Sequence, residues 1–138
     1  ISLVTREKVR PGVKLATRCA FDELAAPLIV LPRELIEKDG KQYYADYLEV
    51  VLWKNGINVW RHYREDGKCF WHQRLGVEYP VAENEIHTLK LQVEKDQFVI
   101  WLNGQKNILH TEDIPEKFHI GLTACEGIAR LYKLTIDN

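Results

Sequence analysis

The sequence contains no methionine, only three cysteines and no long apolar run, and each absence narrows what the chain can be. Its apolar clusters, such as residues 25–31, are interrupted by Pro27 and fall short of the roughly eighteen residues that cross a bilayer. Cys19, Cys69 and Cys125 are too far apart for a zinc knuckle or a Cys-x-x-Cys redox pair, and they allow at most one intramolecular disulfide. The sequence therefore predicts no membrane span, and it favours cysteines that serve as small apolar residues inside strands.

An excess of one charge is also lacking. The chain has 19 basic and 20 acidic residues, which give a formal net charge of −1. Proteins that bind the phosphate backbone of nucleic acids need a strong positive field, and the overall composition provides none. Nucleic acid is therefore not an expected partner.

Targeting and catalytic motifs are missing as well. The first six residues do not show a basic segment followed by an apolar run, so we expect no signal peptide in this chain. Without a starting methionine, the chain fits a mature form or a module of a longer protein, with a secreted or cell-surface location favoured. His-Glu-x-x-His, Gly-x-Ser-x-Gly, phosphate-binding glycine loops and dinucleotide fingerprints are absent. The spacings of four histidines, His72, His87, His110 and His119, do not suggest a shared set of metal ligands, so no transition-metal site or other cofactor is predicted.

Short alternating runs of apolar and polar residues dominate what is present. A length of 138 residues predicts one domain, 1–138, and the alternation predicts an all-β sandwich of two antiparallel sheets. Asn55-Gly56 and Asp66-Gly67 predict tight hairpin turns, and residues 32–40 predict at most a short helical turn near 33–38. The expected strands are 13–21, 28–31, 43–54, 57–64, 69–75, 87–94, 98–103, 118–125 and 128–136.

Two consecutive hairpins place many polar and aromatic side chains on one face. If Asn55-Gly56 is a two-residue turn, alternation assigns an apolar face to Leu48, Val50, Leu52, Ile57, Val59 and Tyr63. The opposite face carries Tyr47, Glu49, Val51, Trp53, Asn58, Trp60, His62, Arg64, Trp71 and Gln73. The predicted cross-strand rows on that face are Glu49-His62-Trp71 and Val51-Trp60-Gln73.

Such a face has the chemistry of a sugar-binding site, because sugars present flat C–H faces that stack on aromatic rings and hydroxyls that hydrogen-bond to polar side chains. In the alternative interpretation, the tryptophans simply cover the sheet beneath a loop. A dry covering would not bring five polar side chains with it, which favours a site. The predicted carbohydrate-binding residues are Tyr47, Glu49, Trp53, Asn58, Trp60, His62, Arg64, Trp71 and Gln73.

The C-terminal half adds a family resemblance. Residues 87–93, 99–104, 120–122 and 127–136 are similar in order and pattern to the last strands of concanavalin A-like lectin/glucanase domains, including laminin-G-like modules. The resemblance implies a jelly roll with one concave sheet on which carbohydrate is usually bound. It leaves calcium open without assigning ligands, since many domains of the group hold a calcium ion. The predicted partners are a glycan or polysaccharide and other domains of a larger parent protein.

The resemblance does not extend to catalysis. Glucanases of this group carry Glu-x-Asp-x-x-Glu, and the nearest match, residues 94–99, ends in Val99 and crosses a predicted turn. The leading prediction is thus a non-catalytic, lectin-like module. Two alternatives stay open: a structural or protein-interaction sandwich, and a polysaccharide lyase or glycoside hydrolase that uses Glu49 and His62, with Arg64 holding a uronate. A structural ion pair between Glu49 and His62 is the simpler interpretation of that pair.

Overall fold

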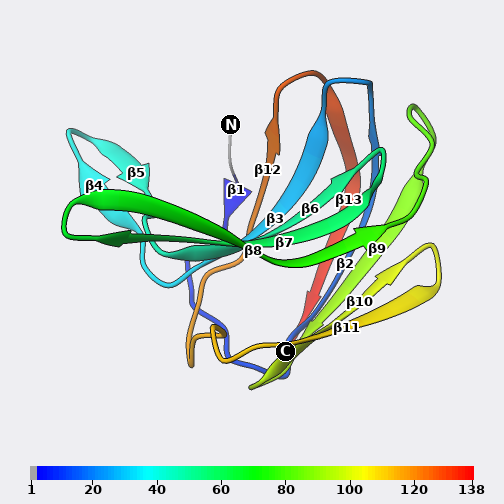
Figure 1. The fold of residues 1–138 in the computed structure, drawn as a ribbon. Helices are drawn as coiled ribbons and strands as arrows, with labels where there is room; N and C mark the ends of the chain where they lie inside the picture. Colours follow the sequence, from blue (N-terminus) through cyan, green and yellow to red (C-terminus); the bar gives the residue numbers. More distant parts are fainter. Residues whose placement is uncertain (1–2) are drawn as a thin grey trace.

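The fold is a sandwich of two antiparallel sheets, described by a computed structural model over residues 3–138 (Figure 1). Ile1 and Ser2, which begin the segment expected to contain no signal peptide, lie outside the described residues. The described residues form strands and no helix: β1 (Leu3–Val4), β2 (Lys14–Phe21), β3 (Ala26–Pro32), β4 (Ile36–Lys38), β5 (Lys41–Tyr43), β6 (Tyr47–Trp53), β7 (Gly56–Glu65), β8 (Lys68–Glu78), β9 (His87–Val93), β10 (Gln97–Leu102), β11 (Gln105–His110), β12 (Gly121–Cys125) and β13 (Ala129–Asp137).

Two large sheets form the sandwich. One has six strands in the order β1-β12-β3-β6-β7-β8, and the other has five in the order β11-β10-β9-β2-β13. A small third sheet, β4-β5, stands beside the six-stranded sheet like an arm (Figure 1). The predicted all-β sandwich of two antiparallel sheets is confirmed.

The core lies between the two large sheets because alternate residues of each strand point inward. On β6 the inward residues Leu48, Val50 and Leu52 are at most 2% exposed, and the residues between them are half-buried. Leu89 and Leu91 of β9 face them from the other sheet, fully buried. Burying each such side chain stabilises the fold by about 1.5–3 kcal/mol. Tyr63 was expected on this apolar face, but it is not part of the core; it lies farther along β7, stacked on Phe70.

Hairpin turns form at Asx-Gly dipeptides, one of which, Asp66-Gly67, the sequence predicted as a turn. At Asp66-Gly67 both residues have positive φ, 49° and 74°, and Glu65 pairs with Lys68 across a two-residue hairpin. Asn103-Gly104 makes a similar turn, with φ of 50° and 86°. It leads into β11, a strand that the sequence did not predict.

The predicted helical turn near 33–38 is wrong. This segment contains β4, which pairs with β5 through a hairpin at Asp39-Gly40, where φ is 53° and 69°. Gly40 suggested a helix end, but an Asp-Gly pair with both φ positive favours a tight hairpin as strongly as it does at residues 66–67. β1, β4 and β5 were also not predicted as strands.

The first hairpin differs from its predicted register. Trp53 pairs with Gly56, so the turn consists of Lys54 and Asn55 rather than Asn55 and Gly56. Gly56 is the first residue of β7, at a φ of 137°, and a Cβ there would lie 1.9 Å from the carbonyl oxygen of Val77. The glycine is therefore required by its backbone conformation and by the close approach of β8, although it is not one of the two turn residues. Because the pairing shifts by two residues, every side chain keeps its predicted face.

Candidate functional site

The nine predicted site residues lie on the strands β6, β7 and β8, at positions that alternate with the inward ones and so point away from the core. We call this surface the aromatic face. Its cross-strand rows are Tyr47-His62-Trp71, Glu49-Trp60-Gln73 and Val51-Asn58-Gly76.

The two hairpins differ in how well their rows were predicted. The pairs of the second hairpin, His62 with Trp71 and Trp60 with Gln73, are confirmed. In the first hairpin, Glu49 lies opposite Trp60 and not opposite His62, because of the two-residue shift. Trp60 consequently has a carboxylate on one side and an amide on the other, which the predicted rows did not give.

His62 is held between two neighbours on β6. Its ring stacks on Tyr47, with centroids 4.4 Å apart and planes 6° from parallel, and its Nε2 contacts Glu49 Oε2. Tyr44 meets Tyr47 edge-on, at 4.7 Å between centroids. Burial, with a smaller contribution from the charge of Glu49, raises the pKa of Tyr47 to about 12. Tyr47 is therefore a neutral hydrogen-bonding phenol at neutral pH, and the His62 ring has a fixed orientation.

A second polar group lies one row away. Gln73 Nε2 donates to Asn58 Oδ1 at 3.1 Å and to the carbonyl oxygen of Leu75 at 3.3 Å. The Asn58 amide lies between Gln73 and Trp53, and the opposite orientation of this amide exchanges the bond from Gln73 for one in which its oxygen accepts from Trp53 Nε1 at 3.3 Å. A Cβ at Gly76 would lie 2.4 Å from Gln73 Nε2, so this glycine leaves the space that the amide fills.

The three tryptophans of the aromatic face have different surroundings. Trp53 packs, with Val51, against a small apolar cluster of β3, so it partly covers the sheet as the alternative interpretation supposed. Trp60 is half-buried in the middle of the face, and Trp71 is 61% exposed on β8. Arg64 is exposed near the β7–β8 turn, and among the described residues no hydrogen bond, ion pair or ring contact joins it to the other predicted site residues.

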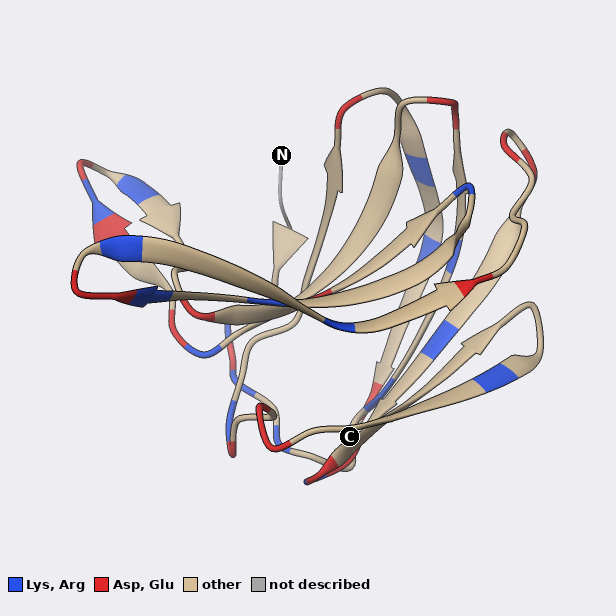
Figure 2. Ribbon diagram, viewed as in Figure 1, with Lys and Arg blue, Asp and Glu red and all other residues tan. Residues whose placement is uncertain are grey.

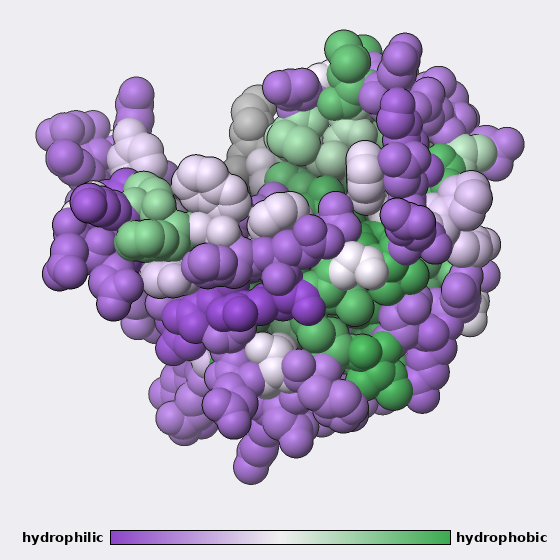
Figure 3. Space-filling model, in the orientation of Figure 1, coloured by the Kyte–Doolittle hydropathy of each residue, from purple (hydrophilic) through white to green (hydrophobic). Residues whose placement is uncertain are grey.

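The β4–β5 arm stands beside the aromatic face. Tyr44, which follows β5, packs on the same apolar cluster as Trp53, made of Ala26, Leu28 and Val30. Figure 3 shows the outline of the molecule notched between the arm and the sandwich, with apolar surface on the sandwich side of the notch. An extended ligand on the aromatic face would thus meet a wall at one end.

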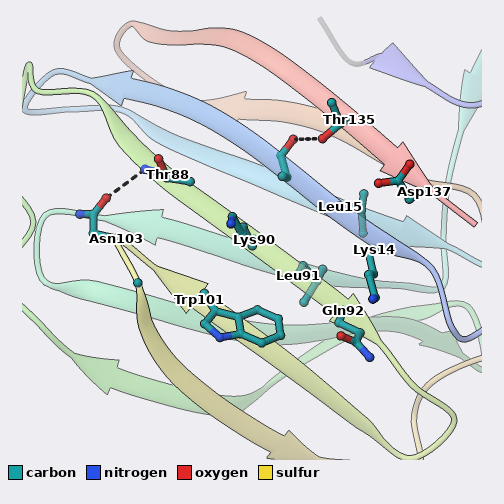
Figure 4. A pocket seen from close by; sticks show the side chains of 12 residues that line it. Lys14, Leu15, Thr88, Lys90, Leu91, Gln92, Trp101, Asn103, Thr135 and Asp137 are labelled. Carbon is teal, nitrogen blue, oxygen red and sulfur yellow. Dashed lines mark hydrogen bonds between the residues drawn. The ribbon is translucent and has the colours of Figure 1, made fainter.

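Sequence reasoning missed a second surface. A depression of about 840 Å³ lies on the outward side of the five-stranded sheet (Figure 4). It is lined by residues of four strands, among them Lys14, Lys90, Gln92, Trp101 and Thr135. Trp101 lies between buried Ile100 and Leu102, so its outward direction follows from alternation alone. This alternation is visible in the sequence, but the predicted site included only residues of the two hairpins between residues 47 and 73.

Among the described residues, three of the four histidines outside the aromatic face, all except His110, have a hydrogen-bond partner in the protein. His87 contacts the carbonyl oxygen of Ala82 at 2.6 Å, His119 that of Thr5 at 3.0 Å, and His72 the hydroxyl of Tyr63 at 3.1 Å. Within residues 3–138, no three His, Cys, Asp or Glu side chains come together as a metal-binding group. No helix long and apolar enough to span a membrane occurs in that range.

Comparison with known proteins bears on the fold. No family model and no curated protein sequence matches the chain. Among solved structures, the carbohydrate-binding module CBM66 from Bacillus subtilis superimposes with a TM-score of 0.73 at 15% identity, covering 99% of this chain and 81% of that one. The fold is a concanavalin A-like jelly roll.

Two further structures share this jelly roll. Chicken galectin 2 matches with a TM-score of 0.66 at 10% identity, over 99% of this chain and 97% of the galectin. A kappa-carrageenase from Pseudoalteromonas carrageenovora, solved in complex with a kappa-carrageenan oligotetrasaccharide, matches with a TM-score of 0.61 at 15% identity, over 90% of this chain and 54% of the enzyme. The resemblance noted in the sequence is thus confirmed at the level of fold.

Proposed function

We propose that this jelly roll is a non-catalytic carbohydrate-binding module whose ligand lies on the aromatic face. The observation that carries the proposal is the row Glu49-Trp60-Gln73 beside the row Tyr47-His62-Trp71. In the first row, an indole is flanked by a carboxylate and an amide; in the second, a fixed imidazole lies between a phenol and an exposed indole. Both rows are half-buried or exposed, so a ligand can reach them.

The geometry fits a sugar better than a flat apolar ligand. A pyranose ring stacked on Trp60 would place its hydroxyls next to Glu49 and Gln73, which lie on the neighbouring strands about 4.8 Å away. The contacts of Gln73 with Asn58 and of Glu49 with His62 fix these polar groups before a ligand arrives. Side chains ordered in advance lose less conformational entropy on binding.

The comparisons support the same proposal without assigning a sugar. The similar structures include a protein described as a carbohydrate-binding module, a galectin and a carrageenase in complex with its oligosaccharide. Because identities of 10–15% carry only the fold, the proposal depends on the side chains of this chain.

The test is a panel of neutral glycans and polysaccharides, with binding followed by quenching of tryptophan fluorescence. We expect saturable binding to one sugar class and a loss of roughly thirtyfold, or about 2 kcal/mol, in Trp60→Ala. Tyr132→Ala, which removes another exposed aromatic ring from the distant strand β13, is the matched control and should bind normally. Unchanged affinity in a folded Trp60→Ala protein, or silence across the panel, would sink the proposal and favour a protein-docking face.

The contact between His62 and Glu49 favours a second candidate function, a polysaccharide lyase or glycoside hydrolase. Incubation of the protein with each polysaccharide that it binds, followed by a reducing-end assay, separates the two functions. A binding module releases no product, whereas an enzyme releases product that Glu49→Gln abolishes.

A further inference from the structure

The positive charges of the chain are unevenly distributed. On the five-stranded sheet, the residues that point away from the core include six cations: Lys14, Arg18, Lys90, Lys106, Arg130 and Lys133. Asp137 is the one carboxylate at an outward position of these five strands, all of which the structure describes. Figure 2 shows blue along this sheet, with red near its turns and strand ends. The whole chain carries −1, so this basic face is a local feature that composition conceals.

These cations also lack ionic partners. Within the part of the chain that the structure describes, none of the six lies in a salt bridge, whereas Arg33, Arg61 and Arg74 elsewhere all contact carboxylates. Among the six cations, Lys106 lies above an aromatic ring: its Nζ is 5.9 Å from the centre of the Trp101 ring. Unpaired like charges on one sheet repel one another, and a bound polyanion would relieve that repulsion.

The strand register gives the basic face a centre. One cross-strand row reads Thr135-Ala16-Lys90-Trp101-Lys106, so the indole has a lysine on each side. Ala16 is the small residue of this row, and the depression of about 840 Å³ lies over it, between β13 and Trp101. Figure 4 shows the indole lying across the sheet next to Lys90 and Gln92, within the rim of this depression. The flat ring of Trp101, the lysines on either side of it and the depression thus occur together on this sheet.

We infer that the basic face is a second binding site, specific for an anionic polysaccharide whose repeating sulfate or carboxylate groups are matched by these cations. A sugar ring stacks on Trp101, and its anionic substituents pair with Lys90 and Lys106. Arg18 and Lys133, paired in the next row, extend the positive strip toward β13. This inference does not depend on the proposed function, because the two faces share no residue.

A nucleic acid fits the basic face less well. Proteins that bind single strands stack successive bases on several neighbouring aromatic platforms. Trp101 is the one aromatic ring among the outward residues of β2, β9 and β10 in the described structure, and the exposed rings of His110 and Tyr132 lie on β11 and β13, at the two opposite edges of the sheet. Duplex recognition needs an element that enters a groove, whereas these side chains belong to a sheet surface. A polysaccharide, with one ring to stack and charges spaced along a chain, requires neither.

The experiment measures binding of the full chain to immobilised dextran sulfate and polygalacturonate, with neutral dextran, single-stranded oligonucleotide and anionic phospholipid vesicles as the other arms. We expect binding to one or both anionic polysaccharides and none to dextran, with affinity falling about tenfold between 50 and 200 mM salt. Dextran sulfate alone would indicate a sulfate ligand, and polygalacturonate alone a uronate.

Variants locate the site. Lys90→Gln with Lys106→Gln should weaken binding about tenfold, and Trp101→Ala by a similar factor. Lys41→Gln with Lys68→Gln, two exposed lysines on other elements, removes the same charge and should bind normally. Trp60→Ala should also bind normally, which separates failure here from failure of the proposed function. Equal losses in both double variants, preferential binding to the oligonucleotide or the vesicles, or no binding to either polysaccharide would overturn the inference.

Discussion

At the scale of single residues, two glycines show how backbone conformation and neighbouring strands decide whether a larger side chain can be accommodated. Gly56 has a φ of 137°, and a Cβ there would lie 1.9 Å from a β8 carbonyl oxygen, whereas at Gly67, with φ of 74°, nothing lies within 4 Å. The two glycines are both in hairpins and both have positive φ. They differ in whether a neighbouring strand occupies the space of the missing side chain.

Gly56→Ala should therefore lower the free energy of unfolding by about 3 kcal/mol, because β7 and β8 must separate to admit the methyl group. Gly67→Ala should cost only about 1 kcal/mol, the price of a left-handed alanine. Urea unfolding of the two variants and the wild type measures both. Equal losses would show that the close approach at Gly56 relaxes freely.

The three cysteines differ in their exposure to solvent. All three are free thiols, and burial raises the pKa of Cys19 to about 11, while Cys69 and Cys125 are exposed. We expect an aromatic disulfide reagent at pH 8 to modify two thiols in the native protein and the third only after unfolding. Cys19→Ala should show the same native count and no further thiol on unfolding.

The raised pKa of Cys19 also predicts how stability depends on pH. The thiol stays neutral in the folded state up to about pH 11 but ionises from pH 9.0 in the unfolded chain. The contribution of this thiol to the free energy of unfolding is fully present below pH 9 and is lost as the pH rises from 9 to 11. Thermal unfolding of wild type and Cys19→Ala across that range measures the difference, and parallel curves would contradict it.

At the scale of elements, a salt-bridge network ties the segment after β11 to the β7–β8 hairpin. Asp113 contacts Arg61 of β7 and Arg74 of β8, the latter at 2.8 Å, and its side chain is 15% exposed. Arg61 also lies near Asp46, just before β6, at 3.7 Å. Burial would raise the pKa of Asp113, but the hydrogen bond and charge of Arg61, aided by Arg74 and Thr111, outweigh burial and hold that pKa below 3.8.

Asp113→Asn should thus reduce stability by about 1–2 kcal/mol at neutral pH, a modest value because the arginines are partly exposed. A lowered carboxyl pKa contributes stability above pH 3.8 that is lost as pH falls through the folded-state value. The variant should therefore approach the wild type in acid. Urea titrations at pH 7 and pH 3, with Glu112→Gln as the neighbouring control, test both points; a constant gap would refute this account.

The burial of each strand explains whether the sequence predicted it. Strands with strict alternation, such as β6 and β9, were found because one face of each is buried. β4 and β5 were missed because all their residues are exposed and carry no such pattern. β11 was missed because its inward face is mostly accessible, with Leu109 its one buried residue. Apolar and polar residues alternate along a strand when one of its faces is buried. A strand that is exposed on both faces therefore lacks this alternation and is hard to predict.

At the scale of the whole molecule, two chemically different faces lie on opposite sides of one core. The aromatic face belongs to the six-stranded sheet and the basic face to the five-stranded sheet. Sites that share no residue and are separated by a packed core should act independently. This arrangement would let one domain hold a neutral and an anionic glycan at once.

We therefore expect Trp60→Ala to weaken binding of the neutral glycan alone, and the Lys90→Gln, Lys106→Gln protein to weaken binding of the anionic polysaccharide alone. The combined variant should show each loss unchanged, with free energies that add within about 0.5 kcal/mol. Fluorescence titrations of the four proteins with both ligands make the comparison. Loss of both ligands on a single substitution would indicate one shared site.

The sequence by itself determined the sandwich, most of the strands and the face to which each site residue belongs, because alternation has a period of two and survives an even shift in register. It did not determine which residues lie across from one another. Glu49 faces Trp60 because the turn lies one residue earlier than its dipeptide predicted, and Gly56 instead stands where β8 comes close, a contact between segments some twenty residues apart. The basic face, too, arises only when β2, β9, β11 and β13 align in one sheet, since charges scattered along a chain become a surface only through long-range pairing.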